Sequence, residues 1–457
     1  MCGKSKRSGI STSMKKILLI ASILATSVYA KDSISIGTLA DGTEFKVEKH
    51  FYGKYINGFT PVQGKPQLCI RIGDRKASEQ QELGLYDISE HRMKWTTDVD
   101  YSKDYYIATR LGVLLYSDKK TYFLNEEGDI CWEKKGFLPF YADLRDSVVV
   151  GYPSTKSKQL HGVSMKKGKN LWVAEIPQKG GWREMRSFDN GHMLISSDKI
   201  FKLNAWTGEM SSFDVDNMHK NDKGAWTAAV GSAIGIGLAL ATGTGFITTY
   251  SPNGDSNFYQ LNSNFCIDDD RIYYADRSSL YCLDYNLHPI WVQELPKKAS
   301  FSYLYIQNDT LFYENSGYGK NIRGNYYCDT KPYQMHYDLK DGTELSEKKN
   351  LKDEDYHVNC YMKEADKSCF SPRKLTYKEM EKLKRKKRND VYETYRKLSK
   401  THSLISCDKD FYIIDLDGNI LLHFSEPIIQ AELVDDVLVG LTDLNVIFQF
   451  NLSALKI

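Results

Sequence analysis

The sequence predicts an all-β fold, a β-propeller of four-stranded antiparallel blades, and three observations support this prediction. One hairpin motif recurs along most of the chain, its closing aromatic residues lie about forty positions apart, and apolar residues alternate with polar ones at a period of two. The chain also holds 31 tyrosines among 457 residues, and aromatic side chains favour strands because they pack well on a pleated surface. We expect eight blades, with seven as the alternative, because inserted loops blur the period.

The recurring motif reads as an apolar alternating strand, a polar turn and a second strand that starts near a large apolar residue. Seven copies occur, at Leu85–Trp95, Tyr122–Trp132, Gly162–Trp172, Phe201–Phe213, Tyr281–Trp291, Met335–Leu345 and Tyr412–Leu422. Asx side chains, which can accept hydrogen bonds from the backbone two residues on, open the turns at Asn125, Asn204, Asp284, Asp338 and Asp415. Glycines that can supply the positive φ of a tight turn follow at Gly128, Gly168, Gly208, Gly342 and Gly418.

The spacing of the motif sets the size of the repeating unit. The closing residues Trp95, Trp132, Trp172 and Phe213 are 37, 40 and 41 positions apart, which is the length of four short strands with their connections. Further strands are expected upstream of the hairpins, at Tyr105–Thr109, Ser147–Gly151, Met193–Ser196 and Arg271–Ala275. A helical repeat of similar length would need apolar residues at spacings of three and four, and here the spacing is two.

With this pattern of strand, Asp, Gly and Trp, residues 60–457 resemble the PQQ-like propeller repeat family. In that family the tryptophan docks one blade onto the next, and the resemblance implies this structural role for Trp95, Trp132, Trp172 and Trp291. The copies that end at Leu345 and Leu422 lack the tryptophan.

The two ends of the chain are expected to close the ring. Residues 428–457 contain a last group of strands, and the hairpin Ile34–Val47, which turns at Asp41 and Gly42, could pair with them. Closure would remove the exposed strand edges that invite aggregation.

Residues 1–30 have the form of a leader with a signal peptide, because Lys15 and Lys16 precede an apolar run and small residues end at Ala30. An uncleaved anchor is the alternative. Residues 31–457 would then be a single exported propeller domain, periplasmic or extracellular. Removing the leader takes away five Lys or Arg and no acid, so the formal net charge falls from +2 to −3. Without a broad basic surface, nucleic-acid binding is not expected.

Two segments interrupt the repeat, and the first is the uncharged, Gly- and Ala-rich stretch 224–254. Its residues 226–250 are long enough to suggest membrane insertion as an alternative function. The large residues Ile234, Ile236, Leu238 and Leu240 alternate, however, which favours a buried inner strand or strand pair.

The second interruption is an insertion at about residues 350–401. Residues 374–400 contain eleven Lys or Arg against four acids, and the segment is interpreted as a charged helix. Such a helix would either face water or dock on an anionic surface, such as an acidic protein, a phosphate-bearing glycolipid or a membrane. The candidate docking residues are Lys382, Lys384, Arg385, Lys386, Lys387 and Arg388.

No catalytic, cofactor or metal site is expected. The chain has no GxSxG, HExxH or Walker motif, and its histidines form no pair at ligand spacing on one element. The aspartates at 268–270 and 415–417 are interpreted as turn residues and not as calcium ligands. Eight cysteines follow the leader without a tight spacing, and if one disulfide forms we expect it between Cys360 and Cys369.

The sequence therefore predicts an exported, non-catalytic propeller that binds a protein or glycan partner in the cell envelope. In broad type it resembles the propeller subunit of outer-membrane barrel assembly, although no lipid-anchor cysteine stands at the predicted cleavage site. The PQQ-like resemblance also raises the alternative of a quinone-dependent oxidoreductase. Such enzymes typically carry two adjacent cysteines beside the quinone, and this chain has no Cys-Cys dipeptide.

Overall fold

The structure of the chain is a computed structural model. The structure describes residues 33–50, 54–62, 64–73, 81–101, 103–142, 147–153, 159–176, 184–188, 191–196, 199–215, 259–260, 263–276, 278–296, 302–321, 326–328, 331–352, 357–363, 369–376, 379–380, 382–383, 391–434 and 436–455. The regular elements of this part are β-strands, together with one short 3-10 helix, η3 (Leu452–Ala454). The described chain is all-β, as the alternation of apolar residues predicts.

Six sheets each contain four antiparallel strands, and each sheet is named here by its first strand. The β3 sheet contains β3 (Ile56–Pro61), β4 (Gln67–Ile72), β5 (Gln81–Asp87) and β6 (Arg92–Val99). The β7 sheet contains β7 (Tyr105–Thr109), β8 (Gly112–Ser117), β9 (Lys120–Leu124) and β10 (Ile130–Lys135). The β11 sheet contains β11 (Leu138–Ala142), β12 (Val148–Tyr152), β13 (Gln159–Ser164) and β14 (Asn170–Glu175).

The other three follow in chain order. The β15 sheet contains β15 (Glu184–Phe188), β16 (His192–Ser196), β17 (Lys199–Asn204) and β18 (Met210–Asp214). The β20 sheet contains β20 (Cys266–Asp268), β21 (Arg271–Ala275), β22 (Ser279–Asp284) and β23 (Pro289–Glu294). The β24 sheet contains β24 (Ser302–Gln307), β25 (Thr310–Asn315), β28 (Tyr333–Asp338) and β29 (Glu344–Asn350). A small sheet joins β19 (Tyr259–Gln260), β26 (Tyr318–Asn321) and β27 (Tyr326–Cys328).

An eleven-stranded sheet contains both ends of the described chain, in the order β31-β30-β32-β33-β34-β35-β1-β2-β38-β37-β36. Its N-terminal strands are β1 (Ser33–Leu39) and β2 (Glu44–His50). The rest are β30 (His357–Lys363), β31 (Phe370–Thr376), β32 (Val391–Lys397), β33 (Ser403–Cys407), β34 (Asp410–Ile414), β35 (Ile420–Phe424), β36 (Ile428–Val434), β37 (Val437–Thr442) and β38 (Ile447–Asn451). Strand β2 pairs with β38, so the predicted pairing between the N-terminal hairpin and the last strands is confirmed.

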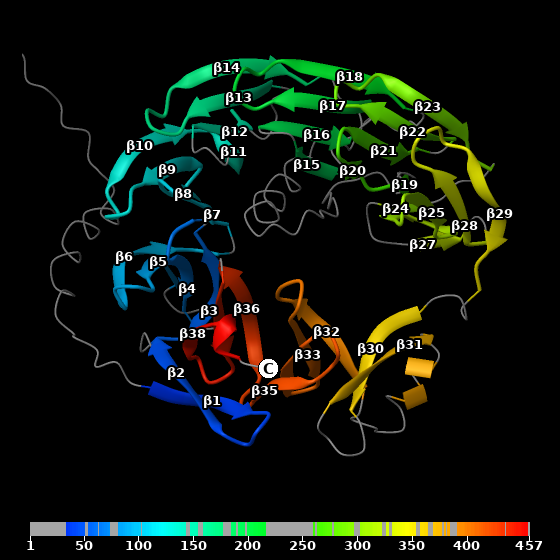
Figure 1. Cartoon of the computed structure of the whole chain (residues 1–457). Coiled ribbons are helices and arrows are strands. Elements are labelled where there is room, and N and C mark those ends of the chain that lie inside the picture. The colour runs from blue at the N-terminus through cyan, green and yellow to red at the C-terminus, as the bar shows by residue number, and fades with distance from the viewer. Residues whose placement is uncertain are drawn as a thin grey trace, which may run out of the picture.

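The sheets follow one another around a ring, which is the arrangement of a β-propeller (Figure 1). All seven predicted hairpins are present as antiparallel strand pairs. Strands also occupy the four upstream positions, as β7, β12, β16 and β21.

The hydrophobic core is divided among the spaces between neighbouring sheets. One buried cluster joins the β3 and β7 sheets through residues such as Leu85 and Val113, and another joins the β11 and β15 sheets through Val150 and Phe201. Each sheet therefore depends on its neighbours to remove its apolar faces from water.

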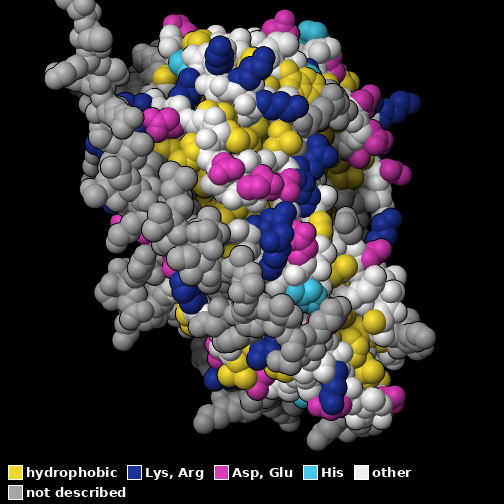
Figure 2. All heavy atoms as spheres, turned by 90° about the vertical axis from the view of Figure 1, so that its left-hand side faces the viewer, with side chains coloured by type: hydrophobic (Ala, Val, Ile, Leu, Met, Phe, Trp, Pro, Cys, Tyr) yellow, Lys and Arg dark blue, Asp and Glu magenta, His cyan; other side chains and the backbone are white. Residues whose placement is uncertain are grey.

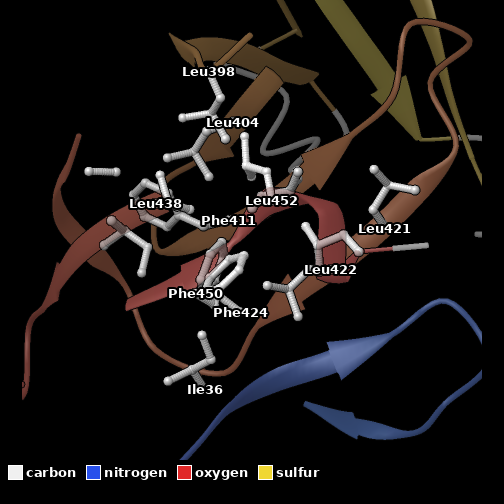
Figure 3. Close-up of a cluster of buried hydrophobic side chains, with 14 of the residues drawn as sticks. Ile36, Leu398, Leu404, Phe411, Leu421, Leu422, Phe424, Leu438, Phe450 and Leu452 are labelled. Carbon is white, nitrogen blue, oxygen red and sulfur yellow. The ribbon is translucent and has the colours of Figure 1, made fainter. Parts of the chain in front are cut away.

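The eleven-stranded sheet, here called the closing sheet, contains a large cluster of buried hydrophobic side chains, which Figure 3 shows in close-up. Ile36 from β1 belongs to the same cluster as Phe424 from β35 and Phe450 from β38 (Figure 3). Phe45 from β2 meets Phe450 edge-to-face, with ring centroids 5.1 Å apart. The ring is thus closed by side-chain packing as well as by backbone pairing.

The charged helix predicted at 374–400 is not seen, and this prediction is corrected. Residues Val391–Lys397 form strand β32, and helical conformation in the described part of this insertion is limited to residues 379–380 and 382–383. Val391 and Tyr392 are 4% and 3% exposed, so the strand is fixed by burial of β-branched and aromatic side chains. The pattern of charges along the sequence contains no information about this tertiary packing.

The expected Cys360–Cys369 disulfide is also wrong, because both cysteines are free. The Cys360 thiol is buried and lies 3.7 Å from the carbonyl oxygen of Arg373. The leader 1–30 and the segment 224–254 lie outside the described residues. Within the residues that are described, no helix has the length and apolar character needed to cross a membrane.

Candidate functional site

In each of the five turns with an Asx residue, its side-chain oxygen accepts a hydrogen bond from the backbone N–H two residues on. Asp415 accepts backbone N–H groups from Asp417 and Asn419 at 2.9 and 2.8 Å, and Asn125 does the same for Glu127 and Asp129. The Asp415 side chain therefore stabilises its turn. The five turn glycines have φ between 64° and 88°, the left-handed region that L-residues rarely adopt.

Each repeat tryptophan covers the turn glycine of the following sheet. A Cβ added at Gly168 would lie 2.7 Å from the Trp132 ring, and one at Gly208 would lie 2.6 Å from Trp172. Trp95 lies in the same way over Gly128, and Trp291 lies over Gly342.

Three of these indoles also donate a hydrogen bond to the turn that they cover. Trp132 Nε1 donates to the Met165 carbonyl oxygen at 2.6 Å, and Trp172 Nε1 donates to that of Ala205 at 2.9 Å. Trp291 Nε1 donates to the Leu339 carbonyl oxygen at 3.3 Å. Each of these indoles thus packs in the space that a glycine leaves and donates a hydrogen bond to the same turn, and both contacts hold one sheet against the next. Trp95 differs, because its buried Nε1 has no hydrogen-bond partner among the described residues.

Two junctions depart from this pattern. Phe213 replaces the tryptophan at one of them, and the following turn carries Leu287 at φ 66° where the other turns carry glycine. Phe213 instead packs edge-to-face on Tyr281, with ring centroids 5.1 Å apart. At the next departure, Leu345 stands in the tryptophan position of the β24 sheet and is 53% exposed.

The turn that Leu345 would be expected to cover is occupied by the inserted hairpin β30–β31. The Phe370 N–H donates to the Gly418 carbonyl oxygen at 2.7 Å, and Cys369 forms an isolated bridge with Asn419. The Phe370 ring packs on Tyr392 and Tyr412 at centroid distances of 4.8 and 5.1 Å. The insertion therefore takes the place of a neighbouring sheet against β32–β34, between β29 and β32 in Figure 1.

The two faces of the β24 sheet differ, because one is buried and the other is only partly covered. In the preceding β20 sheet, Tyr273 faces the cluster shared with the β24 sheet, and Tyr274 faces the cluster shared with the β15 sheet. In the β24 sheet, Leu304 and Tyr313 belong to the first of these clusters. The opposite face, here called the open face, consists of Tyr303, Tyr305, Phe312, Glu314, Gln334 and His336.

Strand register arranges the open face in two rows. Tyr303, Glu314 and Gln334 lie side by side across β24, β25 and β28, and Tyr305, Phe312 and His336 form the adjacent row. Tyr305 stacks on Phe312 with centroids 4.9 Å apart and an interplanar angle of 8°. Tyr303 and Tyr305 are 42% and 38% exposed.

Polar groups link these rings. Gln334 donates from Nε2 to the Tyr305 hydroxyl at 2.9 Å, and its Oε1 lies 3.2 Å from His336 Nε2. Burial raises the pKa of Glu314, whereas burial and the positive charge of Lys349 lower the pKa of His336. The face therefore combines flat aromatic surface with fixed polar groups, an arrangement suited to binding.

Of the candidate docking residues, Lys382 is exposed, and Lys384, Arg385, Lys386, Lys387 and Arg388 lie outside the described residues. On the side of the molecule that carries β6 and β10, basic and acidic side chains are interspersed, with apolar side chains between them (Figure 2). The open face was missed at the sequence level. The alternation of Tyr303, Tyr305 and Gln307 marks one face of a strand, but it does not reveal whether a neighbour covers that face.

No family model matches the chain, and no curated protein matches it, so the PQQ-like repeat stays a prediction. Among solved structures, BamB from Moraxella catarrhalis is 11% identical, with a TM-score of 0.39 over 88% of this chain and 99% of that one. The dihydro-heme d1 dehydrogenase NirN is 8% identical, with a TM-score of 0.37 over 93% and 76% of the two chains. The β-propeller domain of Cps50 (Swd1) from Myceliophteria thermophila is 5% identical, with a TM-score of 0.32 over 88% and 99%. None of these likenesses identifies a family or an activity for this chain.

Proposed function

We propose that this protein is an exported, non-catalytic propeller that binds a protein partner through the open face of the β24 sheet. The observation that carries the proposal is the exposure of Tyr303 and Tyr305 beside Phe312 on a sheet whose opposite face is fully packed. A contiguous exposed aromatic surface on a folded protein typically marks an interaction site. Tyrosine and phenylalanine are also enriched at the centres of protein interfaces.

Eight blades are part of the proposal. The six separate four-stranded sheets would be six of the blades. Strands β32–β35 would form the seventh blade, and β36–β38 together with β2 would form the eighth. In this interpretation the insertion β30–β31 sits between two blades, and the partner would bind at that junction.

Export rests on the form of residues 1–30, and amino-terminal sequencing of the protein from its native cell tests it. The expected mature chain begins at Lys31. A chain that retains Lys15 and Lys16 in a soluble intracellular fraction would overturn this part.

Site-specific photo-crosslinking in the native cell tests the binding face. A crosslinking residue at position 303 or 305 should give a discrete protein adduct. The matched controls are positions 173 and 292, because Val173 and Val292 are 51% and 47% exposed on outer strands β14 and β23. Equal adducts at all four positions, or none at 303 and 305, would contradict the proposal.

A second experiment measures affinity for the partner that the adduct identifies. Phe312→Ala should weaken binding at least about tenfold, since truncating a central aromatic contact typically costs about 2 kcal/mol or more. Val292→Ala should leave the affinity unchanged. A soluble glycan that protects position 305 from crosslinking would assign the face to a glycan instead, and an absorbing complex formed with added quinone and calcium would favour the oxidoreductase.

A further inference from the structure

Three potential metal ligands meet where the closing sheet contacts the β3 sheet. Glu48 and His50 lie two positions apart on β2, so they project from the same face of that strand. His91 comes from the turn between β5 and β6, where its φ is 54°. One ligand atom from each of the three residues lies within 4.8 Å of the other two.

The side chains already contact one another. The His50 and His91 rings are stacked with centroids 4.3 Å apart, and His91 Nε2 lies 3.0 Å from a Glu48 carboxylate oxygen. These contacts join residues that are 41 positions apart in the sequence, counting from His50 to His91.

One ring nitrogen of His50, Nε2, makes no hydrogen bond within the described residues. The residue is only 3% exposed, its Nδ1 lies 2.8 Å from the Tyr86 hydroxyl, and its buried Nε2 has no hydrogen-bond partner in the described part of the chain. A buried polar atom without a partner costs free energy, so it calls for an explanation.

We propose that Glu48, His50 and His91 bind a Zn²⁺ ion at the junction between β2 and the β5–β6 turn. Two imidazoles and one carboxylate are a donor set that zinc accepts, with water in the fourth tetrahedral position. Zinc ligand atoms lie about 3.4 Å apart in a tetrahedral site, and the three ligand atoms here already lie within 4.8 Å of one another. Shifts of roughly 1 Å, with one imidazole turned out of the stack, would direct all three ligand atoms at one ion. Tyr86 would accept the Nδ1–H of His50 and hold the tautomer whose Nε2 faces the ion.

The site would strengthen the closure of the ring. Strand β2 belongs to the sheet that joins the two ends of the chain, and His91 belongs to the sheet that follows. An ion held by both would act as a cross-link between sheets, and it would stabilise the folded state in proportion to its free concentration.

Metal titration of the full chain tests the proposal. After treatment with a chelator and desalting, the protein should bind one Zn²⁺ per chain in calorimetry, and Co²⁺ should give visible absorption bands of a tetrahedral site. The Tm should rise with added Zn²⁺ and fall back when the chelator returns.

Three variants make the test specific. Glu48→Gln and His91→Asn should each weaken Zn²⁺ binding at least about tenfold, and asparagine tolerates the positive φ at position 91. His288→Asn is the matched control, because His288 pairs with Asp284 at an exposed turn where the described residues offer no third ligand. Circular dichroism of each variant establishes that it is folded. Failure of the wild-type chain to bind Zn²⁺ below about 100 µM, or equal binding by all three variants, would overturn the proposal.

Discussion

Replacing Gly168 by alanine should destabilise the protein by about 2–5 kcal/mol. Gly168 has φ 64°, and an L-residue in this region costs about 1–2 kcal/mol. The new Cβ would also lie 2.7 Å from the Trp132 ring, in a space that the indole fills. Overpacking of this kind typically costs about 1–3 kcal/mol more, because the ring or the turn must shift.

Gly42→Ala is the matched control. Gly42 has φ 85° in the hairpin between β1 and β2, and a Cβ built there meets no atom within 4 Å. Only the conformational cost of about 1–2 kcal/mol should appear in this variant. The difference between the two alanine variants therefore isolates the contact between Trp132 and the turn of the next sheet.

Urea denaturation followed by far-UV circular dichroism measures both free energies of unfolding. A double-mutant cycle completes the experiment: in a Trp132→Ala background, Gly168→Ala should cost no more than Gly42→Ala does in the native chain. Equal losses for Gly168→Ala and Gly42→Ala in the native chain would refute the docking argument. So would a Gly168→Ala loss that Trp132→Ala leaves unchanged.

Three other perturbations have definite expected outcomes. Phe370→Ala should lower the free energy of unfolding by about 3–5 kcal/mol in a urea titration, because this β31 residue is 1% exposed and packs on Tyr412 of β34. A loss below about 1 kcal/mol would contradict the anchoring role of the insertion. Asp104→Asn should raise the Tm at pH 7 and leave it unchanged near pH 3. Burial raises the pKa of Asp104 in the folded state, so the folded state loses stability as the pH rises through that pKa. A difference in Tm that persists in acid would contradict this cause. In the native protein a maleimide should label Cys131, which is exposed, and spare Cys69, whose pKa burial raises to about 12; peptide mapping that finds Cys69 labelled first would be contrary to the structure.

The local chemistry of the repeat could be predicted from the sequence. The position of each hairpin follows from an alternating strand, an Asx residue and a turn glycine, all within about a dozen residues. Pairing of the N-terminal hairpin with the last strands was also predictable, because two unpaired edges at the chain ends favour closure. The chain spacing of Trp95, Trp132 and Trp172 indicated the size of the sheets in which they lie.

The insertion shows where local pattern failed. The sequence around Val391 combines a run of basic residues with a weak apolar stripe, which indicates a helix when neighbours are ignored. In the folded chain Val391 and Tyr392 are buried, Phe370 packs on the Tyr392 ring, and the segment is a strand. The contact that decides between the two conformations comes from a different part of the chain.

By itself, the sequence determined the all-β class, the hairpins, their turns and the closure of the ring, because each depends on residues near in sequence or on the unpaired chain ends. Only the tertiary structure decided that Tyr305 stays exposed while Tyr274, at a comparable alternating position, is buried. It alone brought His50 to His91. The physical reason is that the burial of a side chain depends on which sheet packs against it, and packing between sheets joins residues whose separation along the chain leaves no periodic signal.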